Sequence, residues 1–472
     1  MSAAIRSLAS LREPIAAKRS GAIPAPALAR RLEALAQDGF AAFEEQGIPT
    51  RRLEQWKGTN LARLEAMSFT RVGPTSTTTS TTTTTEASAG DEAGESFDLE
   101  FVDGRLLPPS ASRATLPEGV RVLSLAEAAV DAPELLEAHL GAIPDLKRES
   151  LVALNTALFE DVALIHLERR ARTDRPIRIR SLATADGPES ASASFPRLTV
   201  VAEPDSEATI FFESGCRGEA PGLTTFVAEY QLAAGARIET VEVQTGGPER
   251  IHVTSSHARL EANARFESHV FSLGTGLVRG ELWVTLDEPG AETRMRGFFL
   301  GREHGHVDHF TTVDHAAAHC TSDEEYRGVL GDDSDGVFRG RVIIRAGAQQ
   351  SDARQSNPNL LLSDRASIDT KPQLEIYADD VRASHGATIG QLDEDALFFL
   401  RARGIDAAEA RLVLTRGFAF RIVEGIENES VRADVGSQVE AALAALHPTA
   451  IAAAAGDTAK SAAAADSGGR RA

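Results

Sequence analysis

The sequence predicts a mainly β fold with a helical region at each end. Between about Leu151 and Thr388, short runs rich in β-branched and aromatic residues recur, and Gly, Pro and Asp separate them. Residues 1–70 and 393–446 instead repeat apolar residues every three or four positions, which is typical of amphipathic helices. Many short strands without intervening helices indicate a sandwich, a barrel or a β-solenoid. Since no strict repeat period is visible, the pattern alone leaves all three open.

Composition narrows the class of protein. The chain has 472 residues, 42% of them hydrophobic, so it is long enough for two or three parts around a sizeable core. Its net charge of −20 argues against a nucleic-acid partner, because such binders concentrate positive charge. No apolar segment is long enough for a secretory signal or a membrane helix, although the early arginines weakly resemble an organelle transit peptide. We therefore expect a cytoplasmic protein that binds neither nucleic acid nor a membrane.

The two cysteines, Cys216 and Cys320, lie far apart in the sequence and in no paired-ligand pattern. A disulfide framework or a self-contained thiolate metal site is therefore not expected, and a reducing compartment fits. Buried, inert thiols are the commoner role for such cysteines.

The N-terminal third divides into three predicted parts. Residues 1–70 form a helical region. Residues 71–96 are mostly Thr, Ser, small and acidic residues, which cannot bury apolar surface, so a disordered linker is expected there. Residues 97–150 form a mixed α/β lead-in, in which Ser124 and Glu127 make a capping box at the start of a short helix.

The β core is predicted over residues 151–392. Near its end, the two glycines of Asp335–Gly340 predict a turn that leads into a strand over Arg341–Arg345. Leu360–Leu362 is a short apolar run that is expected to be buried.

A C-terminal helical domain is predicted over residues 393–446. After the core the apolar period changes from two to three or four, with Asp393 and Asp406 as N-caps of two helices. One stripe of residues at helical spacing consists of Ala410, Val413, Leu414 and Phe418. Residues 447–472 are mostly Ala, Gly, Ser and Thr, and a disordered tail is expected.

Histidines gather in one stretch of the core, at His304, His306, His309, His315 and His319, followed by Cys320. Imidazoles bind zinc or iron when a fold brings three or four together, so a stand-alone metalloprotein is one interpretation. The spacing matches no standard zinc pattern, and on an extended strand His309 would point away from His304 and His306. The spacing favours a polar outer ladder of a solenoid, with Asp308 and Asp314 as partners of the histidines.

His385 is the sharper candidate for a site. On a straight strand it would share one face with four apolar residues, namely Val381, Ala383, Ala387 and Ile389. That placement would make it a core histidine with one hydrogen-bonded nitrogen.

A series of strings near the end of the core resembles the SufB/SufD family of iron–sulfur cluster assembly scaffolds. The strings are Gly336–Gly340, Gln355–Ser363, Lys371–Ile376, Asp379–Val381, Ser384–Asp393 and Arg403–Ile405. Ser-His-Gly-Ala-Thr-x-Gly at 384–390 is typical of the SufD branch. Thr50–Leu61 is similar to the N-terminal signature of the family, with Gly58 where an aromatic residue is usual. The resemblance implies a right-handed parallel β-helix core flanked by helical regions.

The resemblance also implies a function. It implies a scaffold subunit that is not an enzyme, and that pairs through its β-helix with a SufB-like subunit to build and transfer nascent iron–sulfur clusters. The nascent cluster, shared transiently with the partner, would be the cofactor, and His385 with Ser384, Gly386 and Thr388 would lie at this interface. Homodimerisation of the isolated chain and binding of a reduced flavin to the complex stay open.

The resemblance also implies a second partner, at the helical domain. By the resemblance, Ala410, Val413, Leu414 and Phe418 would belong to a docking surface for a SufC-like ATPase. The chain has no Gly-x-x-x-x-Gly-Lys-Ser/Thr string, so ATP would bind to that partner and not here.

The chain departs from the family at two positions where relatives carry cysteine. The SufB branch has a sulfur-accepting cysteine where Ala366 stands here, and many SufD-like chains have a cysteine at the position of Ala383. A thiolate nucleophile needs a thiol, so any cluster must draw its thiolates from the partner. A β-helix carbohydrate-binding protein is a further alternative, but it predicts a secretion signal and an aromatic groove, and only 5% of the residues are aromatic.

Overall fold

The computed structural model describes residues 3–21, 23–70, 96–108, 116–184, 191–218 and 220–446. Apart from Ser96, the predicted linker lies outside the described residues, as does the predicted tail at 447–472. No helix in the described ranges is long and apolar enough to cross a membrane.

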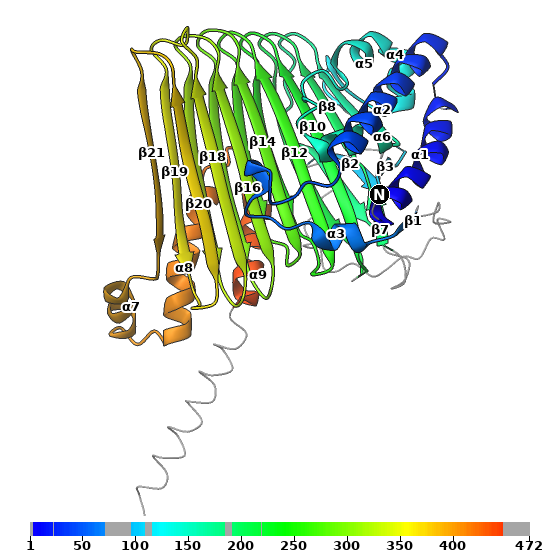
Figure 1. Cartoon of the computed structure of the whole chain (residues 1–472). Helices are drawn as coiled ribbons and strands as arrows, with labels where there is room; N and C mark the ends of the chain where they lie inside the picture. Colours follow the sequence, from blue (N-terminus) through cyan, green and yellow to red (C-terminus); the bar gives the residue numbers. More distant parts are fainter. Residues whose placement is uncertain are drawn as a thin grey trace, which may run out of the picture.

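Two long sheets face each other and form a β-solenoid (Figure 1). Sheet A contains β4 (Val120–Leu123), β5 (Ala163–Leu167), β8 (Arg197–Ala202), β10 (Gly222–Leu232), β12 (Arg250–Leu260), β14 (Leu277–Leu286), β16 (His306–His315), β18 (Asp335–Ile344) and β20 (Ser367–Ile376), with β1 (Phe69–Thr70) and β7 (Ala191–Ser194) beside it. Sheet B contains β3 (Arg105–Leu106), β2 (Phe97–Val102), β6 (Ile177–Ala183), β9 (Glu207–Cys216), β11 (Arg237–Gln244), β13 (Arg265–Ser272), β15 (Glu292–Gly301), β17 (Thr321–Leu330), β19 (Asp352–Leu361) and β21 (Arg382–Gly390).

From β8 onward successive strands alternate between the two sheets, and neighbours within each sheet are parallel. The solenoid makes about seven turns over residues 177–390. The parallel β-helix with helices at both ends is therefore confirmed.

The number of residues in each turn is not constant. Ile251 pairs with Leu277, 26 residues further along the chain, whereas Val342 pairs with Leu374, 32 residues further along. This variation in loop length explains why the sequence shows no strict repeat period.

Alternate side chains of each strand point into the solenoid and form its main core. Aromatic rings pack along this interior, with centroids 4.0 Å apart for Phe212 and Phe226 and 5.2 Å apart for Tyr326 and Phe338. Burying one such side chain contributes roughly 1.5–3 kcal/mol. The interior thus carries most of the apolar stabilisation and holds the strands in register.

Helices of the N-terminal part pack beside the first turns (Figure 1). They are α1 (Ala3–Gly21), α2 (Pro26–Gln46), α4 (Leu125–Asp131), α5 (Pro133–His139) and α6 (Ser150–Leu158). The predicted capping box at the start of α4 is present, because the Ser124 side chain accepts from the Glu127 amide and the Glu127 carboxylate accepts from the Ser124 amide.

The segment that follows α2 crosses the outer face of sheet A and contains η1 (Glu54–Trp56) and α3 (Ala62–Ala66). The guanidinium carbon of Arg279 in β14 lies 3.9 Å from the centroid of the Trp56 ring. Gly58 packs on Val337, and a Cβ there would lie 2.8 Å from Cγ2 of Val337. An aromatic side chain would not fit against β18, so the glycine follows from this close approach.

The C-terminal helices are α7 (Glu394–Arg401), α8 (Ala407–Val423) and α9 (Glu429–Ala445). Asp393 and Asp406 cap α7 and α8 through their side chains, as predicted. The apolar faces of α8 and α9 pack on the outer face of sheet B. The helix that Asp406 caps extends to Val423.

Two expectations for the last turns were wrong. Asp335–Gly340 is not a turn, because it is the first part of strand β18. Gly340 is there because a Cβ would lie 2.0 Å from Nε2 of Gln355 on the facing strand. Leu360–Leu362 is only partly buried, since it lies close to the last turn of the solenoid.

Candidate functional site

The two ends of the solenoid differ. At the first end the sheets finish in β3 and β4, which are short and antiparallel to their neighbours, and the inward residues of β2 and β4 are buried. At the last end, β20 and β21 have no further strand beyond them among the described residues. Ile376, Tyr377 and Ile389 are exposed there. An uncovered strand edge with apolar side chains is a surface that another protein chain can cover.

His385 lies on β21 at this open end. It pairs in register with Gln355 of β19, whose side chain is buried in the interior, so His385 belongs to the inward face of the last turn. It is nevertheless exposed, because no strand follows β21 in the described part of sheet B. The predicted shared face is correct, but the alternative of a buried core histidine is wrong.

The predicted interface neighbours Ser384, Gly386 and Thr388 alternate with His385 along β21. They therefore belong to the outer face of the strand, and all three are exposed. The histidine and these residues lie on opposite faces of one edge strand.

Buried polar side chains lie next to His385 in the interior, on the neighbouring strands of sheet B. Nε2 of Gln355 donates to Oε2 of the buried Glu324 over 2.7 Å, and Oγ1 of Thr311 donates to Oε1 of Glu324 over 2.6 Å. Burial raises the pKa of Glu324 to about 7 against the opposing effect of these two hydrogen bonds. Sequence reasoning missed this group, because Glu324 and Gln355 lie far apart in the sequence and only the register of β17 and β19 brings them together.

The structure does not bring His304, His306 and His309 together. His304 is exposed before β16, with its Nδ1 3.8 Å from an oxygen of Asp333. His306 faces outward and lies 2.9 Å from Oγ1 of Thr59. His309 faces inward. In the described ranges no group of three or more His, Cys, Asp or Glu residues is arranged to hold a metal ion.

The alternative of an outer histidine ladder is also wrong in part. His309 and His315 are buried inside the solenoid, where His309 Nε2 lies 3.2 Å from Oγ of Ser272. The carboxylates predicted as their partners bind arginines instead: Asp308 pairs with Arg279, and Asp314 pairs with Arg345. The direction of each side chain depends on the start of β16, which the sequence pattern did not define.

Sequence reasoning missed a hydrogen-bonded chain in the middle turns. It runs through the interior in the order Ser214, His252, Thr254, Glu242, Gln244, Ser272 and His309. Burial raises the pKa of Glu242 and lowers the pKa of His252 to about 3 and of His309 to about 4. Burial therefore favours the neutral form of each group. The hydrogen-bonded series satisfies buried polar groups that would otherwise be unpaired.

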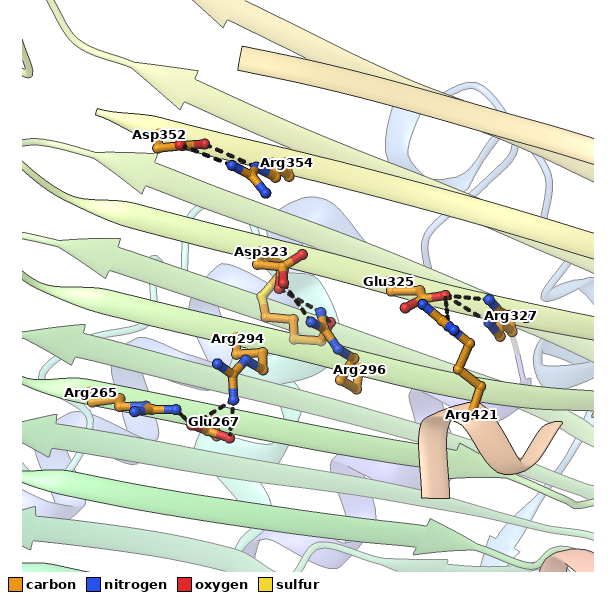
Figure 2. Close-up of polar contacts among 11 residues, drawn as sticks. Arg265, Glu267, Arg294, Arg296, Asp323, Glu325, Arg327, Asp352, Arg354 and Arg421 are labelled. Atoms are coloured by element: carbon orange, nitrogen blue, oxygen red, sulfur yellow. Dashed lines mark hydrogen bonds and ion pairs between the residues drawn. The ribbon is translucent and has the colours of Figure 1, made fainter. Parts of the chain in front are cut away.

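The outer face of sheet B carries alternating arginines and carboxylates beside α8 (Figure 2). Nη1 of Arg294 lies 3.2 Å from Glu267, and Nη2 of Arg296 lies 2.5 Å from Asp323. The three arginines that line the cavity on this face, Arg265, Arg294 and Arg354, are all ion-paired. The pairs Arg294–Glu267 and Arg296–Asp323 join neighbouring strands. Since each arginine of the cavity already has a carboxylate partner, the cavity does not present unpaired cations to an anion.

The predicted docking stripe on α8 is mostly not a free surface. Ala410 is fully buried, Leu414 packs partly against a small apolar cluster, and the Phe418 ring lies 4.7 Å from the guanidinium carbon of Arg327. Val413 is the exposed member of the stripe.

Helix α7 carries exposed aromatic residues that the sequence analysis missed. Phe398 is 74% exposed and Phe399 is 55% exposed, and α7 contacts α8. Val413 of α8 is also exposed, and we call these three exposed apolar residues of the C-terminal helices the α7–α8 surface.

Comparison with known families matches most of the chain. Residues 183–418 match the SufBD core domain of the SUF system for iron–sulfur cluster assembly, and residues 22–179 match the SufBD protein N-terminal region. The boundary between the two matches falls at the start of the regular solenoid turns.

Several proteins of the same family are similar over most of their length. The iron–sulfur cluster assembly protein SufD of Escherichia coli is 27% identical over 86% of this chain and 91% of its own length. A SufBD family protein of Synechocystis is 29% identical over 82% of this chain and 85% of its own, and one of Mycobacterium bovis is 30% identical over 60% and 71%. From these matches and the solenoid fold, we conclude that the chain belongs to the SufBD family of iron–sulfur cluster assembly proteins.

Proposed function

We propose that this chain is a non-catalytic scaffold subunit that pairs through its open end with a SufB-like subunit of a SUF-type complex. The observation that carries the proposal is the uncovered last turn, which combines a free strand edge, exposed apolar residues and His385. A SufB-like solenoid end would cover the edge of β20 and β21 and bury Ile376 and Ile389.

In this proposal His385 is a ligand to the iron of a nascent cluster that is assembled at the interface and then transferred. An exposed imidazole is a suitable iron ligand because its neutral nitrogen can bind the metal. Cys320 is buried, and Cys216 lies on β9, six strands from β21 in sheet B. At a strand spacing of about 4.8 Å that separation is roughly 29 Å. The thiolate ligands therefore come from the partner.

The α7–α8 surface is the proposed docking site for a SufC-like ATPase. Exposed phenylalanines are common anchors of protein interfaces because their burial stabilises a complex strongly. Helix α8 also contacts β15 and β17, and Arg421 of α8 lies 3.7 Å from Glu325 of β17 (Figure 2). Movement of the ATPase would thus act on strands that lie close to the open end.

The decisive experiment co-expresses the chain with the SufB-like and SufC-like proteins of its source and weighs the complex by native mass spectrometry. We expect one copy of this chain in a stable assembly. The His385→Ala variant should assemble normally but lose most of the iron and sulfide that the complex acquires, since one metal ligand is absent. His304→Ala, another exposed histidine, is the matched control and should retain the full content.

Two results would contradict the proposal. One is a chain that elutes alone or only with itself, and the other is a His385→Ala complex with unchanged iron and sulfide. Stoichiometric zinc or iron in the purified single chain would instead support a stand-alone metalloprotein. The family match favours the scaffold over that alternative and over carbohydrate binding.

A further inference from the structure

Three residues of sheet B form a polar column that reaches the open end. Glu324 of β17 pairs in register with Gln355 of β19, which pairs in register with His385 of β21. Side chains in register on neighbouring parallel strands lie on the same face, about 4.8 Å apart at the backbone. The other inward residues of β21, which are Ala383, Ala387 and Ile389, are apolar. His385 is thus the only inward residue of the last strand that can extend the polar column.

The carboxamide of Gln355 is held in one orientation. Its Nε2 donates to Oε2 of Glu324 over 2.7 Å, while Thr311 occupies the other oxygen of that carboxyl group. Gly340 leaves the space that this amide group needs, because a Cβ there would lie 2.0 Å from Nε2 of Gln355. The amide nitrogen is therefore directed toward Glu324.

This orientation leaves one acceptor without a donor. Oε1 of Gln355 is buried and has no hydrogen-bond partner among the described residues, while the side chain as a whole is 3% exposed. A buried acceptor without a partner is destabilising, so a native protein normally supplies a donor. The next residue in the column is His385, whose ring carries an N–H group.

From these contacts we propose that Gln355 is a positioning residue for His385. In this role the His385 ring turns toward β19, so that Oε1 of Gln355 accepts a hydrogen bond from one ring N–H. The bond selects one tautomer and directs the other, unprotonated nitrogen toward the open end. A histidine that binds a metal through one nitrogen commonly donates a hydrogen bond from the other, and the acceptor fixes the ring orientation. The inference rests on the proposed role of His385 as an iron ligand, but the hydrogen bond itself does not require the metal.

Nitrogen NMR of the full chain, labelled with ¹⁵N-histidine, tests the hydrogen bond in the absence of metal. The spectra are recorded above the raised pKa of Glu324, where its carboxylate accepts from Gln355, and His385→Gln assigns the signals. We expect one dominant tautomer of His385 in the unmodified chain. In Gln355→Met, which keeps the side-chain length, the tautomer ratio should shift several-fold, up to about tenfold, toward that of a free histidine.

Two further variants make the test robust. Gly340→Ala displaces the amide without altering Gln355 and should shift the ratio in the same direction. Asn357→Leu removes a buried amide from the same face of β19, but its register partner is Ala387, so the ratio should stay unchanged. Equal ratios in the unmodified chain, Gln355→Met and Gly340→Ala would overturn the proposal.

Iron and sulfide analysis of the complex separates this inference from the proposed function. Suppose that His385 has one fixed tautomer in the unmodified chain, but that the His385→Ala complex has normal cluster content. This result would refute the metal-ligand role and leave the positioning contact valid. Loss of cluster in His385→Ala with an unchanged tautomer in Gln355→Met would refute the positioning role alone. If both roles are correct, Gln355→Met should weaken iron binding by the assembled complex roughly 10- to 100-fold. The control Asn357→Leu should leave iron binding unchanged.

Discussion

Replacement of Arg279 by Leu is expected to destabilise the fold by more than about 3 kcal/mol. The guanidinium group is fully buried between the outer face of sheet A and the segment that contains Trp56. It pairs with the buried Asp308 and, over 2.8 Å, with Glu281. Removal of the cation leaves two buried carboxylates without their main partner, and it also removes the cation–π contact with Trp56.

The midpoint and slope of urea unfolding measure this effect. Arg345→Leu is the matched control, because the Arg345 side chain is 58% exposed and pairs with Asp314 at the surface. Exposed ion pairs contribute about 0–1 kcal/mol, so the control should unfold near the midpoint of the unmodified chain. Equal losses in the two variants would show that burial of the Arg279 ion pair does not decide its importance.

Acidification should produce the second large effect. Burial lowers the pKa of His252 and His269 to about 3 and that of His309 and His315 to about 4, against an ordinary value of 6.5. Between these values the unfolded chain binds protons that the folded chain does not, so the free energy of unfolding falls as the pH falls below 6.5. Each histidine then lowers the free energy of unfolding by about 3 kcal/mol by the time the pH approaches 4.

Buried carboxyl groups act in the opposite direction. Burial raises the pKa of Glu324 from 4.5 to about 7, so the folded chain retains its proton to a higher pH, and this term stabilises the fold as the pH falls from 7 to 4.5. Burial also raises the pKa of Glu239 and Glu242, which act in the same direction. We expect the four histidines to outweigh these carboxyl groups, so that the net result is a loss of stability in acid. Urea midpoints at a series of pH values measure the profile. His309→Gln should make it shallower, the exposed-residue variant His304→Gln should not, and a flat profile for the unmodified chain would contradict the prediction.

The sequence was sufficient for those features that depend on local chemistry. The helix caps at Ser124, Asp393 and Asp406 lie where side-chain acceptors precede apolar helical patterns, and all three are present. The alternation along β21 also placed His385 on the correct face. These predictions succeed because each needs only a few neighbouring residues.

Features that depend on register or on the end of the fold could not be predicted. The burial of His309 follows from the exact start of β16, and the exposure of His385 follows from the absence of a strand after β21 in the described residues. Glu324 and Gln355 are 31 positions apart, and they meet because one full turn of the solenoid contains 31 residues at this place. No periodicity in the sequence encodes these distances, because the turns differ in length.

The unequal ends of the solenoid limit how many chains can associate. A regular stack of parallel strands with two free edges would allow one molecule to add to the next without limit, as in a growing fibre. Here the first end finishes in the short antiparallel strands β3 and β4, whereas the last end leaves the edges of the long parallel strands β20 and β21 uncovered in the described structure. When two solenoids join through their last turns, no long parallel edge is left for a third. Assembly through this surface therefore stops at a closed pair.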